Sequence, residues 1–281
     1  MRTLLLVLLL ALPAVCQGDR DRRSLDLFDL GNGLVDAMRH LDRYRQLESL
    51  NLSFNELTEL PRIPYLNGVR ELDLSGNKLT AVPPELSQAR SLHELDLRGN
   101  QLVHLGRPPW KGMPLLDTLD LGENQLTDLG DLKGLERLIS LDLSDNQLTH
   151  LPAEIGRLRA LRHLDLSRNP LTTLPPEIGQ LTRLEELTLD GTPLVSLPPQ
   201  IGQLKALRRL DMEDTPLKSF PPQLGQLRRL VTLSATGCQA RIPDSFRGLK
   251  GLKWIFVGNL DPAELERVQT LLPWAEVIPI P

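Results

Sequence analysis

Leu138–Leu161 reads LISLDLSDNQLTHLPAEIGRLRAL, and the segments that follow repeat the same pattern. The segment from Leu161 reads LRHLDLSRNPLTTLPPEIGQLTRL, and those from Leu184 and Leu207 begin LEELTLDGTPL and LRRLDMEDTPL. All of them follow the template LxxLxLxxNxLxxLPxxIGxLxx, with threonine in place of asparagine in the segments from Leu184 and Leu207. A fixed period of this length is the signature of a solenoid, in which each repeat packs only against its neighbours.

One apolar residue in the middle of each predicted strand marks the period. These anchors are Leu50, Leu72, Leu95, Leu119, Leu141, Leu164, Leu187, Leu210, Leu233 and Ile255, separated by 22–24 residues. They define nine full repeats and a closing strand within residues 47–259. The template resembles the leucine-rich-repeat family, and its PxxIGxL half is similar to that of Ras-suppressor-like, plant intracellular and bacterial members. This resemblance implies an α/β horseshoe solenoid, with a concave parallel β-sheet and a convex side of 3₁₀ turns and short helices.

Asparagine occupies one interior position in most repeats. The series is Asn55, Asn77, Asn100, Asn124, Asn146 and Asn169, followed by Thr192, Thr215 and Cys238. Because an amide both donates and accepts, asparagine can satisfy backbone groups that the chain buries as it turns. We expect fewer hydrogen bonds from the threonines, and a buried structural thiol rather than a reactive one at Cys238.

The LPxxIGxL half is predicted to be extended and 3₁₀, because its Pro-Pro pairs fix φ and prevent strand pairing. Two repeats depart from the usual length. Residues 105–116 contain one extra residue, with Trp110 and Met113 predicted to take core positions. Residues 129–138 contain one residue fewer, so we expect local irregularity at both places.

Residues 1–18 have the pattern of a secretory signal peptide, with Arg2, an apolar run over Leu4–Leu12, and small residues before Cys16. An uncleaved anchor and a lipid on Cys16 are the alternatives, although Pro13–Cys16 is a poor lipidation motif. We expect no transmembrane span after signal removal, and a place outside the cell or in its envelope (periplasm or cell surface) rather than in the cytoplasm. Cys16 and Cys238 are the two cysteines, so no disulfide framework is predicted.

Both ends of the array are expected to carry caps, because terminal repeats lack a neighbour on one side. Residues 19–46 are predicted to form a spacer and an N-terminal cap, in which Leu27 aligns with Leu50, Asp29 takes a core position and Leu34–Leu47 forms an amphipathic helix. Residues 260–281 are predicted to form the C-terminal cap, with a helix that Asp261 and Pro262 begin. Its apolar tail is expected to fold over Trp254 and Phe256.

The residues between the inward leucines should form the concave face, and from it we select candidate binding residues. They are Asp73, Asp96, Asp120, Asp142, Asp165, Arg162, His163, Arg209, Asp211 and Trp254. The aspartates either receive a cationic or hydrogen-bond-donating partner or are a regular structural part of the LDLS strand. Trp254 near arginines is typical of a protein interface, the alternative to packing under the tail.

No motif for catalysis, metal binding or a phosphate-containing cofactor occurs in the sequence, and the histidines are scattered. The net charge of −4 gives no basic excess that would favour nucleic acid. The sequence therefore predicts an exported, non-enzymatic module without cofactor or metal, a monomer by default, that recognises a protein through its concave face. The alternatives are a glycan- or cell-envelope-binding module and an intracellular scaffold like the Ras-suppressor-like proteins.

Overall fold

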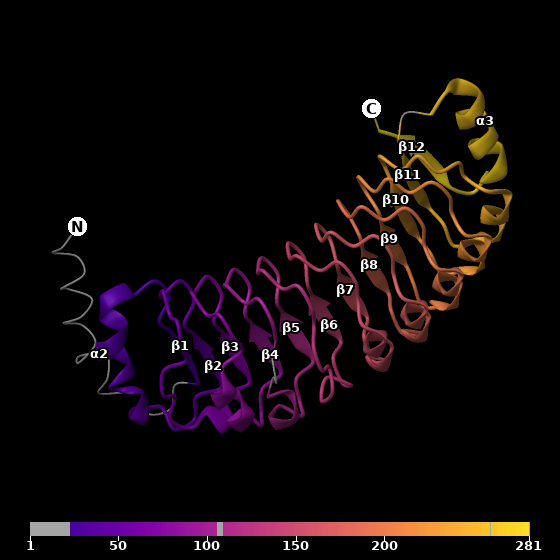
Figure 1. Ribbon diagram of the computed structural model, residues 1–281. Coiled ribbons are helices and arrows are strands. Elements are labelled where there is room, and N and C mark those ends of the chain that lie inside the picture. Colours follow the sequence, from indigo (N-terminus) through magenta and orange to yellow (C-terminus); the bar gives the residue numbers. More distant parts are fainter. Residues whose placement is uncertain (1–22, 106–108, 259, 281) are drawn as a thin grey trace.

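The computed structural model describes residues 23–105, 109–258 and 260–280, and these form a curved stack of repeats (Figure 1). One parallel sheet contains twelve strands of this described chain in sequence order, β1 to β12. They are β1 (Ser24–Asp26), β2 (Ser49–Asn51), β3 (Glu71–Asp73), β4 (Glu94–Asp96), β5 (Thr118–Asp120), β6 (Ser140–Asp142), β7 (His163–Asp165), β8 (Glu186–Thr188), β9 (Arg209–Asp211), β10 (Thr232–Ala235), β11 (Trp254–Val257) and β12 (Glu276–Pro279). The predicted horseshoe solenoid is confirmed.

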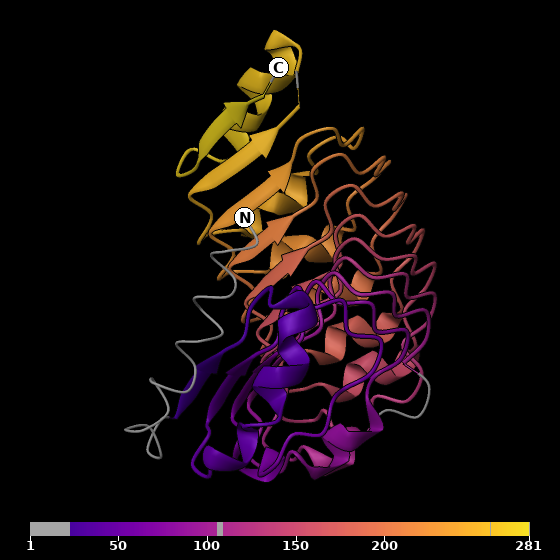
Figure 2. The same ribbon diagram turned by 90° about the vertical axis from the view of Figure 1, so that its left-hand side faces the viewer.

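The register of the sheet confirms the predicted anchors. Leu50 pairs with Leu72, Leu72 with Leu95, and the series continues to Leu233 and Ile255. Each anchor is buried, whereas the residues beside it are half-buried or exposed in nearly every strand. Figure 2 shows the strands of successive repeats side by side along one side of the stack. The column of anchor residues therefore lies in the core, and the two columns that flank it form the concave face.

Short 3₁₀ turns follow the outer edge of the curve (Figure 1). They are η1 (Gly31–Gly33), η2 (Leu41–Arg43), η3 (Leu66–Gly68), η4 (Pro84–Gln88), η5 (Trp110–Gly112), η6 (Ala153–Arg157), η7 (Pro176–Gln180), η8 (Pro199–Gln203), η9 (Pro222–Gln226) and η10 (Asp244–Gly248). In each Pro-Pro pair the first proline caps the turn and the second begins it, as the sequence predicts. Glycine is needed where adjacent turns touch, because a Cβ on Gly202 would lie 2.5 Å from the Gln223 carbonyl oxygen.

The interior asparagines satisfy backbone groups of two neighbouring repeats. Asn77 Nδ2 donates to the carbonyl oxygens of Leu52 and Leu74, while its Oδ1 accepts from the amides of Asn55 and Leu57. Thr215 instead donates one hydrogen bond, to the Met212 carbonyl. The predicted decline in hydrogen bonding toward the C-terminus is confirmed. Cys238 is half-buried rather than fully buried, and burial raises the pKa of its thiol.

The two repeats of unusual length keep their core. Trp110 and Met113 are buried, as predicted, so the longer repeat fills its interior with a tryptophan where others have isoleucine. The shorter repeat has turns but no 3₁₀ helix between Gly130 and Leu138, all of which the structure describes. The expected irregularity is therefore local, and the sheet continues through both repeats.

The N-terminal end differs from the prediction in register. β1 pairs Leu25, not Leu27, with Leu50, and Asp29 is exposed with φ 49° rather than in the core. The offset between the first two strands is therefore 25 residues. Leu27 is buried but follows β1, because its amide donates to the Asn51 carbonyl at the end of β2, so the strand begins earlier than the leucine pattern indicates. In place of one helix over Leu34–Leu47 the chain forms α2 (Leu34–Met38) and η2. Val35, one of the apolar residues of the predicted amphipathic helix, is exposed.

At the C-terminal end, α3 (Pro262–Leu271) begins as predicted, with Asp261 accepting from the Glu264 amide. The tail does not fold over Trp254 and Phe256. It forms β12 beside β11, with Glu276 next to Trp254 and Ile278 next to Phe256. The physical reason is that residues 276–280 can extend the backbone hydrogen bonding of the sheet, as in the bond from the Ile280 amide to the Val257 carbonyl.

Several predictions lie outside the described residues or are not tested by them. The signal peptide over residues 1–18, the lipid on Cys16 and the first part of the spacer fall in the undescribed segment. The boundaries 19–46, 47–259 and 260–281 stay predictions. Among the helices that the structure describes, none is both long and apolar enough to cross a membrane.

Candidate functional site

The concave face is built from the two positions that flank each inward anchor. In β4 these are Glu94 and Asp96, and in β7 they are His163 and Asp165. Parallel pairing in register places the same position of successive strands side by side, about 4.8 Å apart. Nine of the ten predicted binding residues occupy these two positions of the strands, and Arg162 directly precedes β7.

The five aspartates of the second position (Asp73, Asp96, Asp120, Asp142 and Asp165) form what we call the Asp column. Each uses its Oδ1 to accept a hydrogen bond from the backbone amide two residues later, at 2.8 Å. In Asp73 and Asp165 the same oxygen also accepts from a serine hydroxyl at 2.6 Å. One carboxylate oxygen of each aspartate therefore stabilises the turn that follows its strand, and the other remains for the concave surface.

Two members of the Asp column hold their protons more tightly than a free aspartate. Partial burial raises the pKa of Asp120 to about 6, and the neighbouring carboxylates of Asp142 and Asp96 raise it further against the opposing effect of the Gly122 amide. Burial also raises the pKa of Asp96. The neighbouring carboxylates on the middle strands thus repel one another, and a cationic group of a partner would relieve this repulsion.

Arg98 offsets part of this charge. Its Nη2 lies 2.6 Å from Glu123 Oε1, and its Nη1 lies 3.4 Å from Asp142 Oδ2, two strands away. Among the described residues, Asp142 is the one member of the Asp column that has an ion pair. The sequence could not indicate this pairing, because Arg98 and Asp142 are 44 residues apart.

Four predicted residues in the second half of the array are already paired within the chain, namely Arg162, His163, Arg209 and Asp211. Arg162 contacts Glu185 at 2.8 Å, and His163 Nδ1 lies 3.1 Å from Glu186 rather than against the Asp column. Arg209 pairs with Asp211, which is almost fully buried and whose Oδ1 has no partner among the described atoms. Pairs across neighbouring strands, and the Arg209–Asp211 pair within β9, therefore offset part of the charge on this half of the concave face.

Trp254 ends this surface. Its side chain is 40% exposed, and Lys253 Nζ lies 5.8 Å from the centroid of its ring. Arg209 occupies the equivalent position two strands away, paired with Trp254 through Thr232. Exposed tryptophan beside cations is a common anchor of protein interfaces. The repeat pattern predicts these residues on the concave face, but it does not predict that β12 pairs beside Trp254 and leaves the ring exposed.

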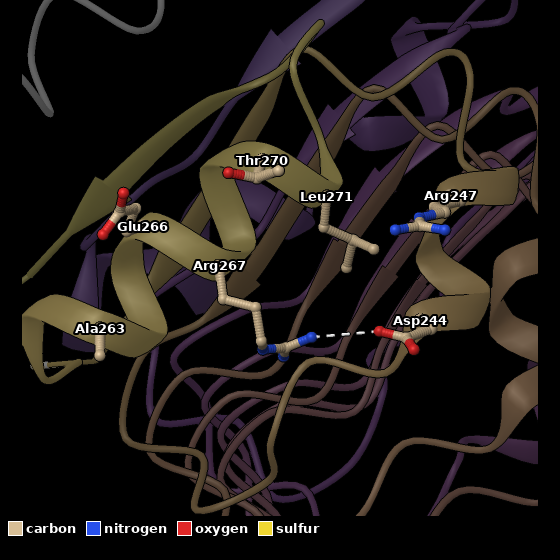
Figure 3. Close-up of a pocket in the computed structure, with 7 residues that line it drawn as sticks. All are labelled: Asp244, Arg247, Ala263, Glu266, Arg267, Thr270 and Leu271. Carbon is tan, nitrogen blue, oxygen red and sulfur yellow. Dashed lines mark hydrogen bonds and ion pairs between the residues drawn. The ribbon is translucent and has the colours of Figure 1, made fainter.

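Away from the concave face, a hollow lies between η10 and α3 (Figure 3). It has a volume of about 370 Å³. Arg267 and Asp244 both line it, and Arg267 Nη1 lies 3.2 Å from Asp244 Oδ1. The remaining groups of Arg267 bind Glu264 and the Ile242 carbonyl, and the Arg267 hydrogen bond lowers the pKa of Glu264. These contacts attach the cap helix to the last turn, so the hollow has a structural explanation.

An exposed aromatic pair that the repeat pattern does not predict lies at the other end of the array. Phe28 and Phe54 are 51% and 54% exposed, and their ring centroids lie 5.4 Å apart. The one signal available was two phenylalanines at positions where other repeats carry small or polar residues. Within the described residues, no group of three metal-binding side chains comes together.

Comparisons with known proteins agree with this architecture. Two family models adjoin on the chain: a leucine-rich repeat over residues 45–102 and a leucine-rich-repeat region over residues 103–194. Together these matches span more than half of the 281 residues. An 84-residue segment, 29% of the chain, is 36% identical to the U2 small nuclear ribonucleoprotein A' of Arabidopsis thaliana, and covers 34% of it.

Solved structures match over a larger share of the chain. A leucine-rich-repeat protein of Leptospira interrogans is 36% identical with a TM-score of 0.78, over 84% of this chain and 62% of the other. The chain thus spans less than two thirds of both this structure and the plant relative. A complex of Latrophilin 3, Unc5D and the leucine-rich repeats of FLRT2 matches with a TM-score of 0.75 at 24% identity, over 85% of this chain and 78% of the other. At that identity the likeness concerns the fold alone.

Proposed function

Because the chain belongs to the leucine-rich-repeat family, we propose that it is an exported, non-catalytic module that recognises a protein partner through its concave face. Modules of this family and fold generally serve in protein interaction, and the FLRT2 repeats are seen in a complex with other proteins. Export, the absence of catalysis and the choice of face belong to the proposal.

The observation that carries the proposal is the exposed Trp254 at the end of an ordered, rigid sheet. Tryptophan and arginine side chains that are held in place lose little conformational entropy on binding. A few such residues can therefore supply much of the binding free energy of an interface. Trp254 is held between β10 and β12, with Lys253 and Arg209 within two strands. A partner that covers this ring would remove a large apolar surface from water.

Export is supported by the composition of residues 1–18 alone. A positively charged start, a short apolar run and a break before small residues are typical of a cleaved leader. The mature N-terminus tests this directly. Mass spectrometry of the protein from fractionated cells should find an N-terminus near Gln17, or a lipid on Cys16, outside the cytoplasm, whereas a cytoplasmic form that retains Met1 would contradict export.

Photo-crosslinking tests the choice of face. A photoreactive amino acid placed at Trp254 or Glu186, both exposed on strands, should capture a protein partner in the cells that produce the chain. The matched positions Gln180 and Gln203 are also exposed but lie on the convex turns η7 and η8. Equal yields from both faces, or capture from the convex face alone, would contradict recognition through the sheet.

A further inference from the structure

The aromatic pair Phe28 and Phe54 is the most exposed pair of aromatic side chains in the described part of the chain. Their rings are tilted by 60° and lie at the edge of the concave face, just after β1 and β2. Adjacent exposed aromatic rings are unfavourable in water and favourable beneath a partner, so such a pair indicates a contact surface. The proposed function does not use it.

The backbone at Phe54 strengthens this interpretation. Phe54 has φ 57°, a left-handed conformation, and the next repeats place Gly76 and Gly99 at the same position with φ 62° and 66°. A bulky aromatic residue is unusual there, because its Cβ crowds the following carbonyl. Glycine or a polar residue would form the turn with less strain, so the fold itself does not require phenylalanine at this position.

The neighbouring repeat leaves space for the ring. A Cβ on Gly76 would lie 2.8 Å from the Phe54 ring, so the ring rests on bare backbone instead of entering the core. Gly99 follows in the next repeat, close to the Gly76 backbone. Phe28, Phe54 and these two glycines thus form a continuous apolar step along the edge of the sheet, which we call the aromatic step.

The surface next to the aromatic step is acidic. Asp26 lies two residues before Phe28 and accepts its amide hydrogen bond, and Asp73 and Asp96 continue the same column. Glu71 and Glu94 lie beside them at the other concave position. Within residues 23–105, none of these five carboxylates has an ion-pair partner.

Basic groups nearby are mostly committed to other acids. Arg23 pairs with Glu48, Lys78 with Glu56, and Arg98 with Glu123. Arg70, which precedes β3, has no such partner among the described residues, and it offsets only part of the excess negative charge. The electrostatic potential at this end of the concave face therefore favours a cationic partner.

We propose that the aromatic step and the adjacent acidic surface bind an extended segment of the partner protein, with an aromatic or aliphatic side chain next to lysine or arginine. The apolar side chain covers Phe28 and Phe54, and the cations lie over Asp26, Asp73 and Glu71. This proposal rests on the proposed function and specifies the chemistry of the partner that the concave face receives.

A random peptide library displayed on phage and selected on the full chain tests this chemistry. We expect enriched peptides to carry an aromatic or aliphatic residue beside lysine or arginine. A synthetic copy of the enriched peptide should bind at least tenfold more weakly to Phe54→Gly, by fluorescence anisotropy. Glycine suits the left-handed backbone, so this variant should melt at an unchanged or higher temperature, which separates lost binding from misfolding.

Tyr65 offers a matched control. Like Phe54, it is an exposed aromatic residue with a positive φ, here 61°. It directly precedes η3 and lies outside the aromatic step. Tyr65→Gly should leave peptide affinity unchanged. Added salt should weaken peptide binding to the wild-type chain, and it should weaken binding to Asp73→Asn less. Asparagine at position 73 keeps the oxygen that accepts the hydrogen bond of the turn.

Four results would overturn the proposal: acidic enriched peptides, no enrichment at all, equal affinity for wild type and Phe54→Gly, or self-association of the chain that Phe54→Gly abolishes. The last result, seen by analytical ultracentrifugation, would make a second copy the occupant. Crosslinking from Trp254 and Glu186 does not depend on Phe54. Its success together with any of these results would refute the aromatic step alone, whereas its failure would refute the proposed function.

Discussion

Between β1 and β6 the concave face carries carboxylates that are mostly without ion pairs. Beside β7 to β9, by contrast, Glu185 and Glu186 pair with residues of the neighbouring strand, and Asp211 pairs with Arg209 within β9. Asp73, Asp96 and Asp120 bind backbone amides through one oxygen. Glu185 and Glu186 instead face Arg162 and His163. The strand geometry is the same in both halves, so the surface charge varies without affecting the fold. The charge that a partner meets is therefore set by which concave side chains each repeat carries.

The interiors of the two halves differ in the hydrogen bonds that their side chains make to buried backbone groups. The first repeats satisfy their buried backbone groups with asparagine, and the last with threonine or cysteine. An array whose repeats interact only with neighbours can open locally, so weaker interior hydrogen bonding should make the C-terminal repeats the less stable part. The N-terminal half, which has more interior hydrogen bonds, thus carries the carboxylates without ion pairs. The C-terminal half, which has fewer, carries Trp254.

The largest expected effect comes from the interior position. Asn146 donates to the carbonyls of Leu121, Leu143 and Ser144 and accepts from the Leu126 amide. Asn146→Ala leaves these groups buried without partners and should destabilise the fold by about 3 kcal/mol or more. Thr215→Val removes the hydrogen bond to the Met212 carbonyl and the weaker contact with Cys238 Sγ, and should cost about 1 kcal/mol. Native-state hydrogen exchange measures both losses, and equal losses would remove the distinction between the interiors.

The close packing of the convex turns predicts a somewhat smaller effect. Gly202→Ala should destabilise the chain by about 2 kcal/mol, because the added Cβ would lie 2.5 Å from the Gln223 carbonyl oxygen and the turns must separate. Gly68, on a convex turn of the first half, is the matched control. A Cβ there meets only the Leu47 carbonyl at 3.6 Å, so Gly68→Ala should change stability by under about 0.5 kcal/mol. Urea unfolding that finds the two variants equally stable would contradict this difference.

The pH dependence of stability follows from Asp120 and Asp190, one in each half, whose pKa values burial raises from 3.8 to about 6. The folded state binds these protons more tightly than the unfolded state, so their contribution to stability increases as pH falls from above 6 to about 4. Asp120→Asn should therefore stabilise the chain by about 1 kcal/mol at pH 7, allowing for partial exposure, and have little effect at pH 4. Carboxyl NMR titration gives the pKa values, and titration of Asp120 near 4 would contradict the prediction.

The smallest expected effect concerns the surface ion pairs. Arg98→Gln and Arg162→Gln should each change stability by under about 1 kcal/mol, because the pairs are largely exposed. They should differ in electrostatics, since Arg98 lowers the pKa of Asp96 and Asp120. We expect Arg98→Gln to raise both pKa values further and Arg162→Gln to leave them unchanged, as NMR titration can measure. A shift of Asp120 in both variants would mean that charge is shared over the whole face.

Most of the candidate surface could be located from the sequence, but not its chemistry. The period identifies Asp73, Asp142 and Trp254 as concave, because the side chains of a strand alternate between its faces. The partners of these residues come from other repeats, such as Arg98 for Asp142. The local backbone bonds of the Asp column were also hidden, since LDLS does not show which carboxylate oxygen binds the following turn.

The sequence by itself determined the solenoid, its leucine core, its 3₁₀ turns and the interior asparagines, because each of these repeats with the period and needs only a like neighbour. Apart from the start of α3, which Asp261 and Pro262 indicate, only the tertiary structure decided the ends, where no neighbour repeats the pattern. It placed Leu25 against Leu50, added β12 beside Trp254 and left Phe28 and Phe54 exposed. Periodicity constrains a residue through its equivalents in adjacent repeats, and a terminal residue has an equivalent on one side only.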